Sequence, residues 1–381
     1  MEKTNENIQF PLVEIMLEFV RAAVLERTPH VPQNIRIDWD RLMDMAAEQG
    51  LIAWVWDGIC KLPVEMQPPR QQRISWSLSA QEIWNSYGHQ KSVLKEVVAV
   101  CEQNNMRLLL LKGVGLSELY PNPPSRPSGD IDIYLFGDFE KGNRVLAGDN
   151  YKFSNKHAEF DFNGVKVENH QSFFYHGTRL QIDVDDYILS VLPECSVSDD
   201  GYYVLPPMAG LVHLLLHTMV HLNNPVEHVT LKNIIDVAYY LFHNKNKLDP
   251  KLCGCIMRKL NLERAFDLYL QVSEWILSVD FSSYRNELSC GSKDLDNIIL
   301  LLLNDTLRSP HFDNYSFVKQ LIQRILYYNK TKWRYSYLRN WKSLNQGFIK
   351  KQISFFIKSI FRIPFDKSLA QFIRYKSDMR D

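Results

Sequence analysis

The chain has 381 residues, and its 44 lysines and arginines balance its 44 aspartates and glutamates, so the formal net charge is zero. This balance argues against a dedicated nucleic-acid binder, which carries a large basic excess, and the 45% apolar content excludes a disordered chain. A chain of this length is expected to form two or three structural units.

The first seven residues are polar and partly acidic, unlike the start of a secretory signal. The longest aliphatic runs, 108–111 and 298–303, are far shorter than the roughly 18 to 20 residues that a membrane span needs. Six scattered cysteines without a Cys-x-x-Cys pair are typical of reduced thiols. We therefore expect a cytoplasmic protein without a transmembrane helix.

The N-terminal part has the spacing of amphipathic helices. Apolar residues recur every three or four positions over 10–102. Asp38 is placed to cap the helix that follows it, and the Pro68-Pro69 pair separates the shorter helices from a long one over about 76–104. An all-helical N-terminal unit is expected over 1–104.

The apolar period changes after residue 105, where strand and helix patterns mix. The predicted strands are 107–111, 130–135, 159–162, 165–170 and 180–184, and the predicted helices are 114–120 and 139–146. Segment 130–135 alternates polar and apolar residues, which is typical of a half-buried strand. Asn163-Gly164 predicts a tight hairpin because both residues tolerate positive φ. We expect a small α+β domain over 105–200.

From Pro206 the helical spacing returns, and a C-terminal helical domain is expected over 201–328. Its predicted helices begin near residue 206 and continue over 231–242, 253–279 and 295–307. His213, His217 and His221 recur every fourth residue, which places them on one helix face. Such a stripe can bind a metal, but without a nearby acidic ligand it favours a face packed against the preceding domain.

The last part of the chain, 329–381, is predicted to be a basic, aromatic-rich helical tail. Residues 319–381 hold fifteen basic and three acidic residues, which leaves 29 basic and 41 acidic residues in 1–318. The alternation of basic and apolar residues over 350–362 is typical of helices that contact anionic membranes or acidic partners. A tail over 330–381 that docks on the acidic remainder of the same chain is the plainer expectation.

The pair Asp130 and Asp132 carries the strongest chemical signal. A period of two places both carboxylates on one strand face, with Cα atoms about 7 Å apart, where they can hold Mg²⁺ together with substrate phosphates. The Asp-x-Asp pattern alone is weak, because the chain contains it four times, at 38/40, 130/132, 183/185 and 294/296. Its context distinguishes the second pair, which follows Gly129 and an upstream strand that ends in Lys112-Gly113.

These residues carry a family resemblance. The run 110–133 resembles the Leu-Lys-Gly…Leu-Tyr-Pro…Arg-Pro-x-x-Asp-x-Asp signature of a largely uncharacterised bacterial nucleotidyltransferase family in the DNA polymerase beta-type superfamily. Segment 164–170 is similar to that family's Val-Glu-x-His strand, and 217–236 is similar to its helical segment. The resemblance covers about 38–240 and implies a small mixed-sheet nucleotidyltransferase core flanked by helical units.

The resemblance implies a metal site. Asp130 and Asp132 match the two metal-binding aspartates, and Glu168 matches the third carboxylate, so the three would hold two Mg²⁺ or Mn²⁺ ions. Asp183 and Asp185 lie on another predicted strand and are alternatives for the third position. His170 either orders a ligand, touches the substrate, or is a surface histidine. These alternatives remain open at the level of sequence.

The resemblance also implies a nucleotide site. Lys112 and Gly113 match a phosphate-binding turn at the start of a helix, where backbone amides suit an anion. Gly129 belongs to the same site, and Arg126 is placed to clamp a phosphate with its guanidinium. Asp236 is expected to form a packing or salt-bridge contact rather than to bind a ligand.

The implied activity is transfer of a nucleoside monophosphate from an NTP such as ATP to a hydroxyl of an unidentified small-molecule or protein acceptor, with release of pyrophosphate. No template nucleic acid is expected as a partner, because the catalytic region lacks a basic groove. The alternative is a non-catalytic nucleotide-binding or regulatory protein, antitoxin-like, with the same fold. Three adjacent carboxylates favour the enzyme, because such like charges are costly to keep without a use.

Overall fold

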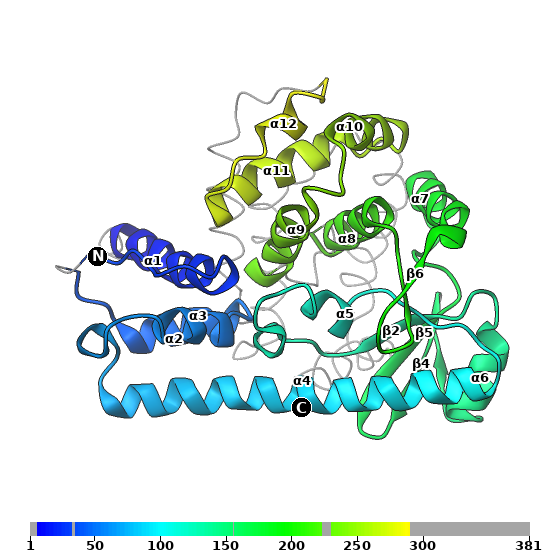
Figure 1. The fold of residues 1–381 in the computed structure, drawn as a ribbon, viewed down its shortest axis with the longest axis horizontal. Coiled ribbons are helices and arrows are strands. Elements are labelled where there is room, and N and C mark those ends of the chain that lie inside the picture. The colour runs from blue at the N-terminus through cyan, green and yellow to red at the C-terminus, as the bar shows by residue number, and fades with distance from the viewer. Residues whose placement is uncertain (1–5, 33–34, 155, 223–229, 290–381) are drawn as a thin grey trace, which may run out of the picture.

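The computed structural model describes residues 6–32, 35–154, 156–222 and 230–289. The predicted helix over 295–307 and the basic tail over 329–381 lie outside the described residues. Figure 1 shows the path of the described chain.

Helices dominate the two ends of the described chain and a sheet occupies its middle. The helices are α1 (Glu6–Val24), α2 (Trp39–Glu48), α3 (Ile52–Ile59), α4 (Arg70–Gln103), α5 (Val114–Ser117), α6 (Phe139–Ala147), α7 (Arg179–Ser190), α8 (Pro207–Leu222), α9 (Leu231–Asn244), α10 (Pro250–Lys259), α11 (Glu263–Leu277) and α12 (Ser282–Arg285). The strands are β1 (Leu109–Leu110), β2 (Ile131–Tyr134), β3 (Lys152–Phe153), β4 (His157–Phe162), β5 (Val165–His170), β6 (Ser196–Val197) and β7 (Tyr203–Val204). The predicted α+β class with a mixed sheet and flanking helices is confirmed.

The seven strands form one mixed sheet in the order β3-β4-β5-β2-β1-β7-β6. β2 lies near the centre, parallel to β5 and antiparallel to β1. β4 and β5 form the predicted hairpin, in which Asn163 and Gly164 adopt φ values of 51° and 80°. All four residues of β2 are buried, so the expectation of a half-buried strand at 130–135 is wrong: both faces of this central strand are covered.

Segment 180–184, predicted as a strand, lies in helix α7. Apolar side chains repeat there every fourth residue as far as Ile188 and are buried, and the Thr178 side chain caps the first turn. A five-residue window is too short to distinguish this spacing from a strand pattern. The prediction is therefore wrong, and Asp183 and Asp185 project from a helix.

The single helix predicted over 253–279 is also wrong, because the chain forms two helices there. α10 ends at Lys259, and Asn261 adopts a left-handed φ of 56° before α11 begins. Asparagine tolerates this conformation better than most residues, so it interrupts the helix where the apolar spacing alone does not.

The sheet has a different helical cover on each face. Ile131 and Ile133 point to one face and share an apolar cluster with Val97 and its neighbours on α4. Tyr134 points to the other face and belongs to a larger cluster with residues of α7, α8 and α9. In Figure 1, α4 runs along one side of the sheet and α7, α8 and α9 lie on the other.

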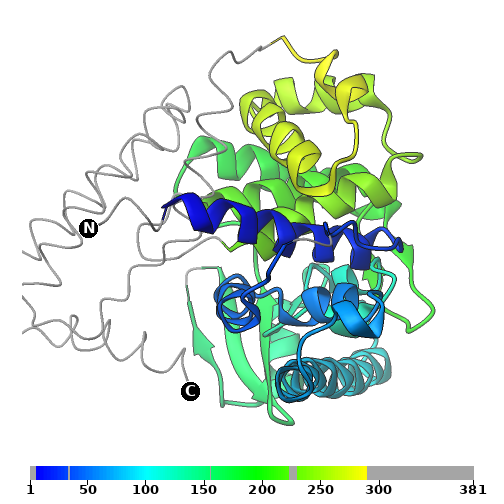
Figure 2. The same ribbon diagram turned by 90° about the vertical axis from the view of Figure 1, so that its left-hand side faces the viewer.

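Helix α1 connects the two ends of the described chain. It lies between α2 and α3 on one side and the C-terminal helices on the other (Figure 2). The Arg21 side chain donates hydrogen bonds of 2.8 Å to the carbonyl oxygens of Ile276 and Trp275 at the end of α11. The helices before and after the sheet therefore share one apolar cluster.

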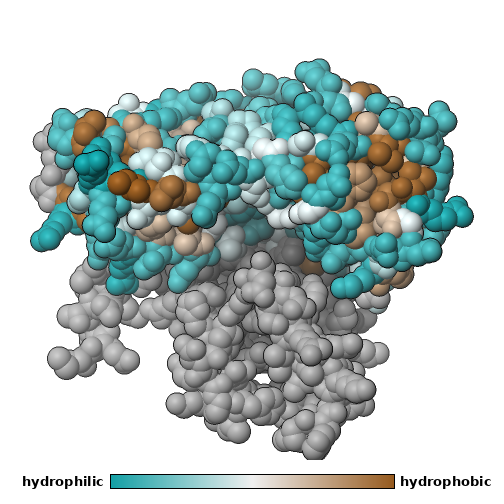
Figure 3. Space-filling view, turned by 90° about the horizontal axis from the view of Figure 1, so that it is seen from below, coloured by the Kyte–Doolittle hydropathy of each residue, from teal (hydrophilic) through white to brown (hydrophobic). Residues whose placement is uncertain are grey.

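The surface along α4 is mainly hydrophilic, with apolar patches toward both ends of the view in Figure 3. Ile74 and Leu78, one turn apart on α4, are 52% and 62% exposed. Among the described residues, no helix is both long and apolar enough to cross a membrane.

Candidate active site

Three carboxylates meet on the sheet face that α8 and α9 cover. β2 and β5 run parallel with Asp132 beside Glu168, and Asp130 precedes Asp132 by two residues on the same face. One oxygen of each carboxylate lies within 4.8 Å of the others. The structure thus brings together the three carboxylates that the sequence suggested as metal ligands.

Asp132 is the most enclosed member of this trio. Its side chain is fully buried, and the Lys112 ammonium lies 3.1 Å from its Oδ2. Although burial opposes ionisation, Lys112 and His170 hold the pKa of Asp132 well below its usual range. Burial and the neighbouring Asp132 charge instead raise the pKa of Asp130. The two aspartates therefore repel each other, and a cation bound beside them would relieve that repulsion.

Glu168 is held by a second lysine. Lys166 Nζ lies 2.7 Å from Oε1 of Glu168, and His170 and Lys166 lower the pKa of the carboxyl to about 2 against the effect of burial. The group is a carboxylate near neutral pH. Ionised carboxylate oxygens are the donors that Mg²⁺ takes in proteins, together with water and substrate phosphates, so the trio fits this ion.

Two imidazoles flank Glu168. His170 Nε2 lies 3.0 Å from Oδ1 of Asp132 and 3.6 Å from Oε2 of Glu168, and His157 Nδ1 lies 3.6 Å from the same Glu168 oxygen. Burial lowers the pKa of His157 to about 4. His170 is 2% exposed, so the reading of it as a surface histidine is wrong.

The Lys112-Gly113 turn lies directly against the aspartates. Gly113 has a φ of 63°, and a Cβ at this position would lie 2.8 Å from the carbonyl oxygen of Asp130. Only glycine fits both conditions without strain. The turn therefore fixes Lys112 beside Asp132, while Gly129 has open space around its Cα.

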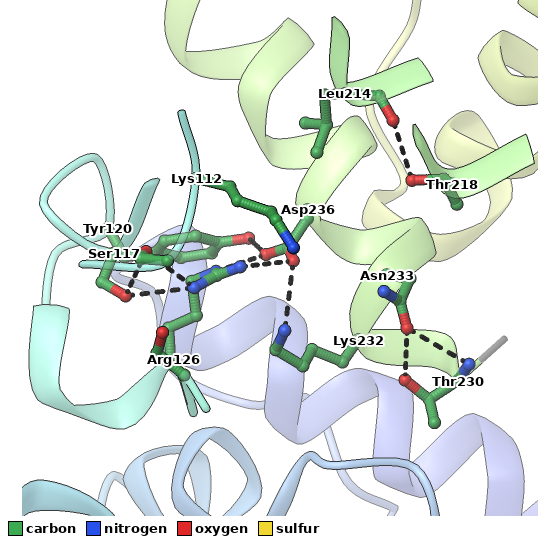
Figure 4. Close-up of polar contacts among 12 residues, drawn as sticks. Lys112, Ser117, Tyr120, Arg126, Leu214, Thr218, Thr230, Lys232, Asn233 and Asp236 are labelled. Atoms are coloured by element: carbon green, nitrogen blue, oxygen red, sulfur yellow. Dashed lines mark hydrogen bonds and ion pairs between the residues drawn. The ribbon is translucent and has the colours of Figure 1, made fainter. Parts of the chain in front are cut away.

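Arg126 forms a buried ion pair with Asp236. Its Nε and Nη2 donate to the two Asp236 carboxylate oxygens at 2.7 and 2.8 Å, and its Nη1 donates to the Gly113 carbonyl oxygen at 2.9 Å and to Ser117 Oγ at 3.2 Å. Tyr120 donates a further hydrogen bond of 2.9 Å to Asp236. Figure 4 shows this network between the turn and α9. The salt bridge expected of Asp236 is present, and Arg126 is its partner.

The turn-rich segment before Asp130 is attached to α4. Gln90 Nε2 donates to the carbonyl oxygen of Ser128 at 2.8 Å, and Trp84 Nε1 donates to Ser125 Oγ at 2.9 Å. The segment is thus fixed both to α4 and, through Arg126, to α9. These contacts fix the position of the segment that leads into β2 and its carboxylates.

Lys232, on the first turn of α9, brings a further charge to the site. Its Nζ lies 3.6 Å from Oδ2 of Asp236, and about one fifth of its side chain is exposed (Figure 4). Burial and the nearby Arg126 charge lower the pKa of Lys232 to about 8. An anion bound near Lys232, in front of α9, would stabilise its charged form.

The alternative third carboxylates have other partners. Asp185 accepts from the Phe174 backbone N–H at 2.9 Å and contacts His176 at 2.6 Å, and Asp183 pairs with Arg179 at 2.8 Å. The structure brings Glu168, not these residues of α7, to Asp130 and Asp132.

The histidine stripe of α8 packs as expected where it is described. His213 is buried, with its ring 5.3 Å from that of Phe174. The His221 side chain lies outside the described residues.

Sequence reasoning missed four side chains around the trio: His157, Lys166, Lys232 and Lys156, whose ammonium interacts with all three carboxylates. His157 had a usable signal, because the Asn163-Gly164 turn fixes the hairpin register and places His157 opposite His170. Lys166 follows from the same face, two residues before Glu168. Lys232 had no local signal, because α9 reaches the sheet only through tertiary packing.

Comparisons with known proteins give one match. A family model described as an uncharacterised nucleotidyltransferase matches residues 36–278. No curated protein and no solved structure matches the chain.

Proposed function

The chain belongs to this family of uncharacterised nucleotidyltransferases, and from that premise we propose that it transfers a nucleoside monophosphate from an NTP to a hydroxyl group of an acceptor in a Mg²⁺-dependent reaction that releases pyrophosphate. The observation that supports this best is the convergence of Asp130, Asp132 and Glu168 on one sheet face. The acceptor is a small molecule or a protein.

Asp130, Asp132 and Glu168 would hold two Mg²⁺ ions. When bound, the ions stabilise the charge on the entering and leaving oxygens of an in-line displacement. Burial matters here, because Asp132 and Glu168 cannot rotate into solvent and so keep their oxygens aimed at one point. The more exposed Asp130 marks the side from which substrate enters.

Lys112 and Lys232 would face the triphosphate from opposite sides of the site. Lys112 is fixed by Asp132, and Lys232 approaches from α9. Arg126 takes a positioning role in this proposal in place of direct phosphate contact, because its hydrogen bonds go to Asp236, Gly113 and Ser117. It holds the Gly113 turn at a fixed distance from α9.

Lys232→Met is expected to weaken NTP binding roughly tenfold at pH 7, because it removes one charge-assisted contact to phosphate. Since the pKa of Lys232 is about 8, wild-type affinity should fall as the pH rises from 7 to 9, while the affinity of the variant should change little. Titration calorimetry with a non-hydrolysable NTP at both pH values measures this. Lys245→Met, at the other end of α9, is the matched control, and equal affinities of wild type and Lys232→Met would contradict the assignment.

The proposed activity is tested with α-labelled NTPs, Mg²⁺ and fractionated small molecules or proteins as acceptors, with the enzyme itself included as an acceptor. We expect a labelled acceptor and stoichiometric pyrophosphate, both absent without Mg²⁺. Thermal stabilisation by Mg²⁺ and NTP with no labelled product and no pyrophosphate would overturn transfer and favour the regulatory, antitoxin-like alternative.

A further inference from the structure

His157, Glu168 and His170 form a second cluster of possible metal ligands, which shares Glu168 with the first. One ligand atom of each lies within 4.8 Å of the others. Oε1 of Glu168 is taken by Lys166 at 2.7 Å, so Oε2 is the oxygen that faces the imidazoles, at 3.6 Å from His157 Nδ1 and 3.6 Å from His170 Nε2. The three donors come from two adjacent strands, β4 and β5, whose register fixes them.

The orientation of the His170 ring suits a metal ligand. Its Nδ1 lies 3.3 Å from the carbonyl oxygen of Ser172, which can only accept, so Nδ1 carries the ring proton. Nε2 then faces Asp132 Oδ1 at 3.0 Å and Glu168 Oε2 at 3.6 Å. An Nδ1–H bonded to a carbonyl oxygen, with Nε2 turned inward, is the usual orientation of a metal-binding histidine.

His157 Nδ1 supplies a second, independent observation. Its Nδ1 is buried and has no hydrogen-bond partner among the described residues, although the ring lies only 5.2 Å from that of His170. A metal ion beside Oε2 of Glu168 would give Nδ1 of His157 a partner and would also lie within reach of Nε2 of His170.

We propose that His157, Glu168 and His170 bind a divalent first-row transition ion of the Zn²⁺ or Co²⁺ type, in a position next to the all-oxygen site of Asp130 and Asp132 that shares Glu168 with it. The 3.6 Å ligand separations match four-coordinate geometry, since bonds of about 2.0–2.2 Å place neighbouring ligands about 3.3–3.6 Å apart. Glu168 would join the two positions, one holding Mg²⁺ and the other an imidazole-bound ion.

Ligand chemistry separates the two ions. Imidazole nitrogen suits Zn²⁺ and Co²⁺, whereas Mg²⁺ takes oxygen donors and keeps much of its water. This inference extends the proposed function by naming an unequal metal pair, and only the catalytic use of the second ion rests on that function. Binding itself is measurable without NTP.

The test is a titration of the full-length, metal-free protein with Co²⁺, followed by visible absorption in the absence of NTP. We expect the intense d–d bands of a low-coordinate Co²⁺ site, removed by one equivalent of Zn²⁺ and retained in a large excess of Mg²⁺. His157→Ala should weaken Co²⁺ binding at least about tenfold while changing Mg²⁺ affinity less than about twofold. His157→Gln, which keeps a polar side chain of similar size, should behave in the same way.

His176→Ala is the matched control, because His176 also pairs with a carboxylate, Asp185, outside the site. It should leave both affinities unchanged, and thermal unfolding confirms that each variant is folded. The inference is overturned if Mg²⁺ displaces Co²⁺ at equal concentration, or if both His157 variants keep the wild-type Co²⁺ affinity. Co²⁺ binding without NMP transfer would contradict only the proposed function and leave the inferred metal site standing.

Discussion

Asp132→Asn is expected to lower kcat/KM for nucleotidyl transfer by roughly 10³-fold or more. The substitution keeps the volume of the buried side chain but removes a charge that would contact both metal ions, and such metal interactions contribute several kcal/mol to the transition state. It also leaves Lys112 without its nearest carboxylate at 3.1 Å. Steady-state kinetics with a labelled NTP, together with the Mg²⁺-dependent shift in Tm, measure both consequences.

Asp183→Asn is the matched control for this prediction. Asp183 opens another Asp-x-Asp pair, but it lies on α7 and contacts Arg179 in a partly exposed position. The activity and the metal-dependent Tm shift of the Asp183→Asn variant should equal those of the wild type. Retention of more than about a tenth of the wild-type activity by Asp132→Asn would contradict the placement of Asp132 at the metal ions.

Arg126→Met is expected to lower the free energy of unfolding by about 3–5 kcal/mol. The guanidinium is 4% exposed and donates two hydrogen bonds to Asp236, so its loss leaves the buried carboxylate with only the Lys232 ammonium, 3.6 Å away, as a neighbouring positive charge. Urea unfolding followed by circular dichroism measures the change. Among the described residues, this substitution has the largest stability effect that we expect.

Two further variants test whether the broken ion pair causes this loss of stability. Arg126→Met combined with Asp236→Leu should recover much of the lost stability, because an apolar pair replaces both partners of the buried ion pair. Arg179→Met breaks an exposed pair on α7 and should cost no more than about 0.5 kcal/mol. If Arg126→Met costs about as little as Arg179→Met, the ion pair does not hold the turn, and Arg126 returns as a phosphate clamp.

The sequence predicts the local parts of the site well, because their signals are local. Alternation in 130–135 places Asp130 and Asp132 on one face, and the Asn163-Gly164 turn sets the hairpin that carries Glu168. The parallel pairing that joins β2 to β5 is not local, and only the resemblance to a known family brought Glu168 to the aspartates. Spacing alone had left Asp183 and Asp185 open.

The remaining features depend on contacts between distant residues. Arg126 and Asp236 are 110 residues apart, and neither alone reveals whether an arginine after a proline-rich turn binds phosphate or a carboxylate. The full burial of His170 likewise depends on the packing of other elements over β5, which no pattern within the strand indicates. The five residues 180–184 of α7 fit both the period of a strand and that of a helix. The two are distinguished only when the following helical turn is included.

The position of α1 has a consequence for how the protein is made. Arg21 donates to a carbonyl oxygen 255 residues further along the chain. One side of α1 can therefore pack on α3 early, whereas the other side can pack only after α11 has been synthesised. At ribosomal rates of about 5–20 residues per second, that delay lasts on the order of tens of seconds. During this time the apolar side chains that α11 will cover remain open to chaperones or to other nascent chains. Of the described helices, α1 is the first to be synthesised and is thus among the last to be fully enclosed.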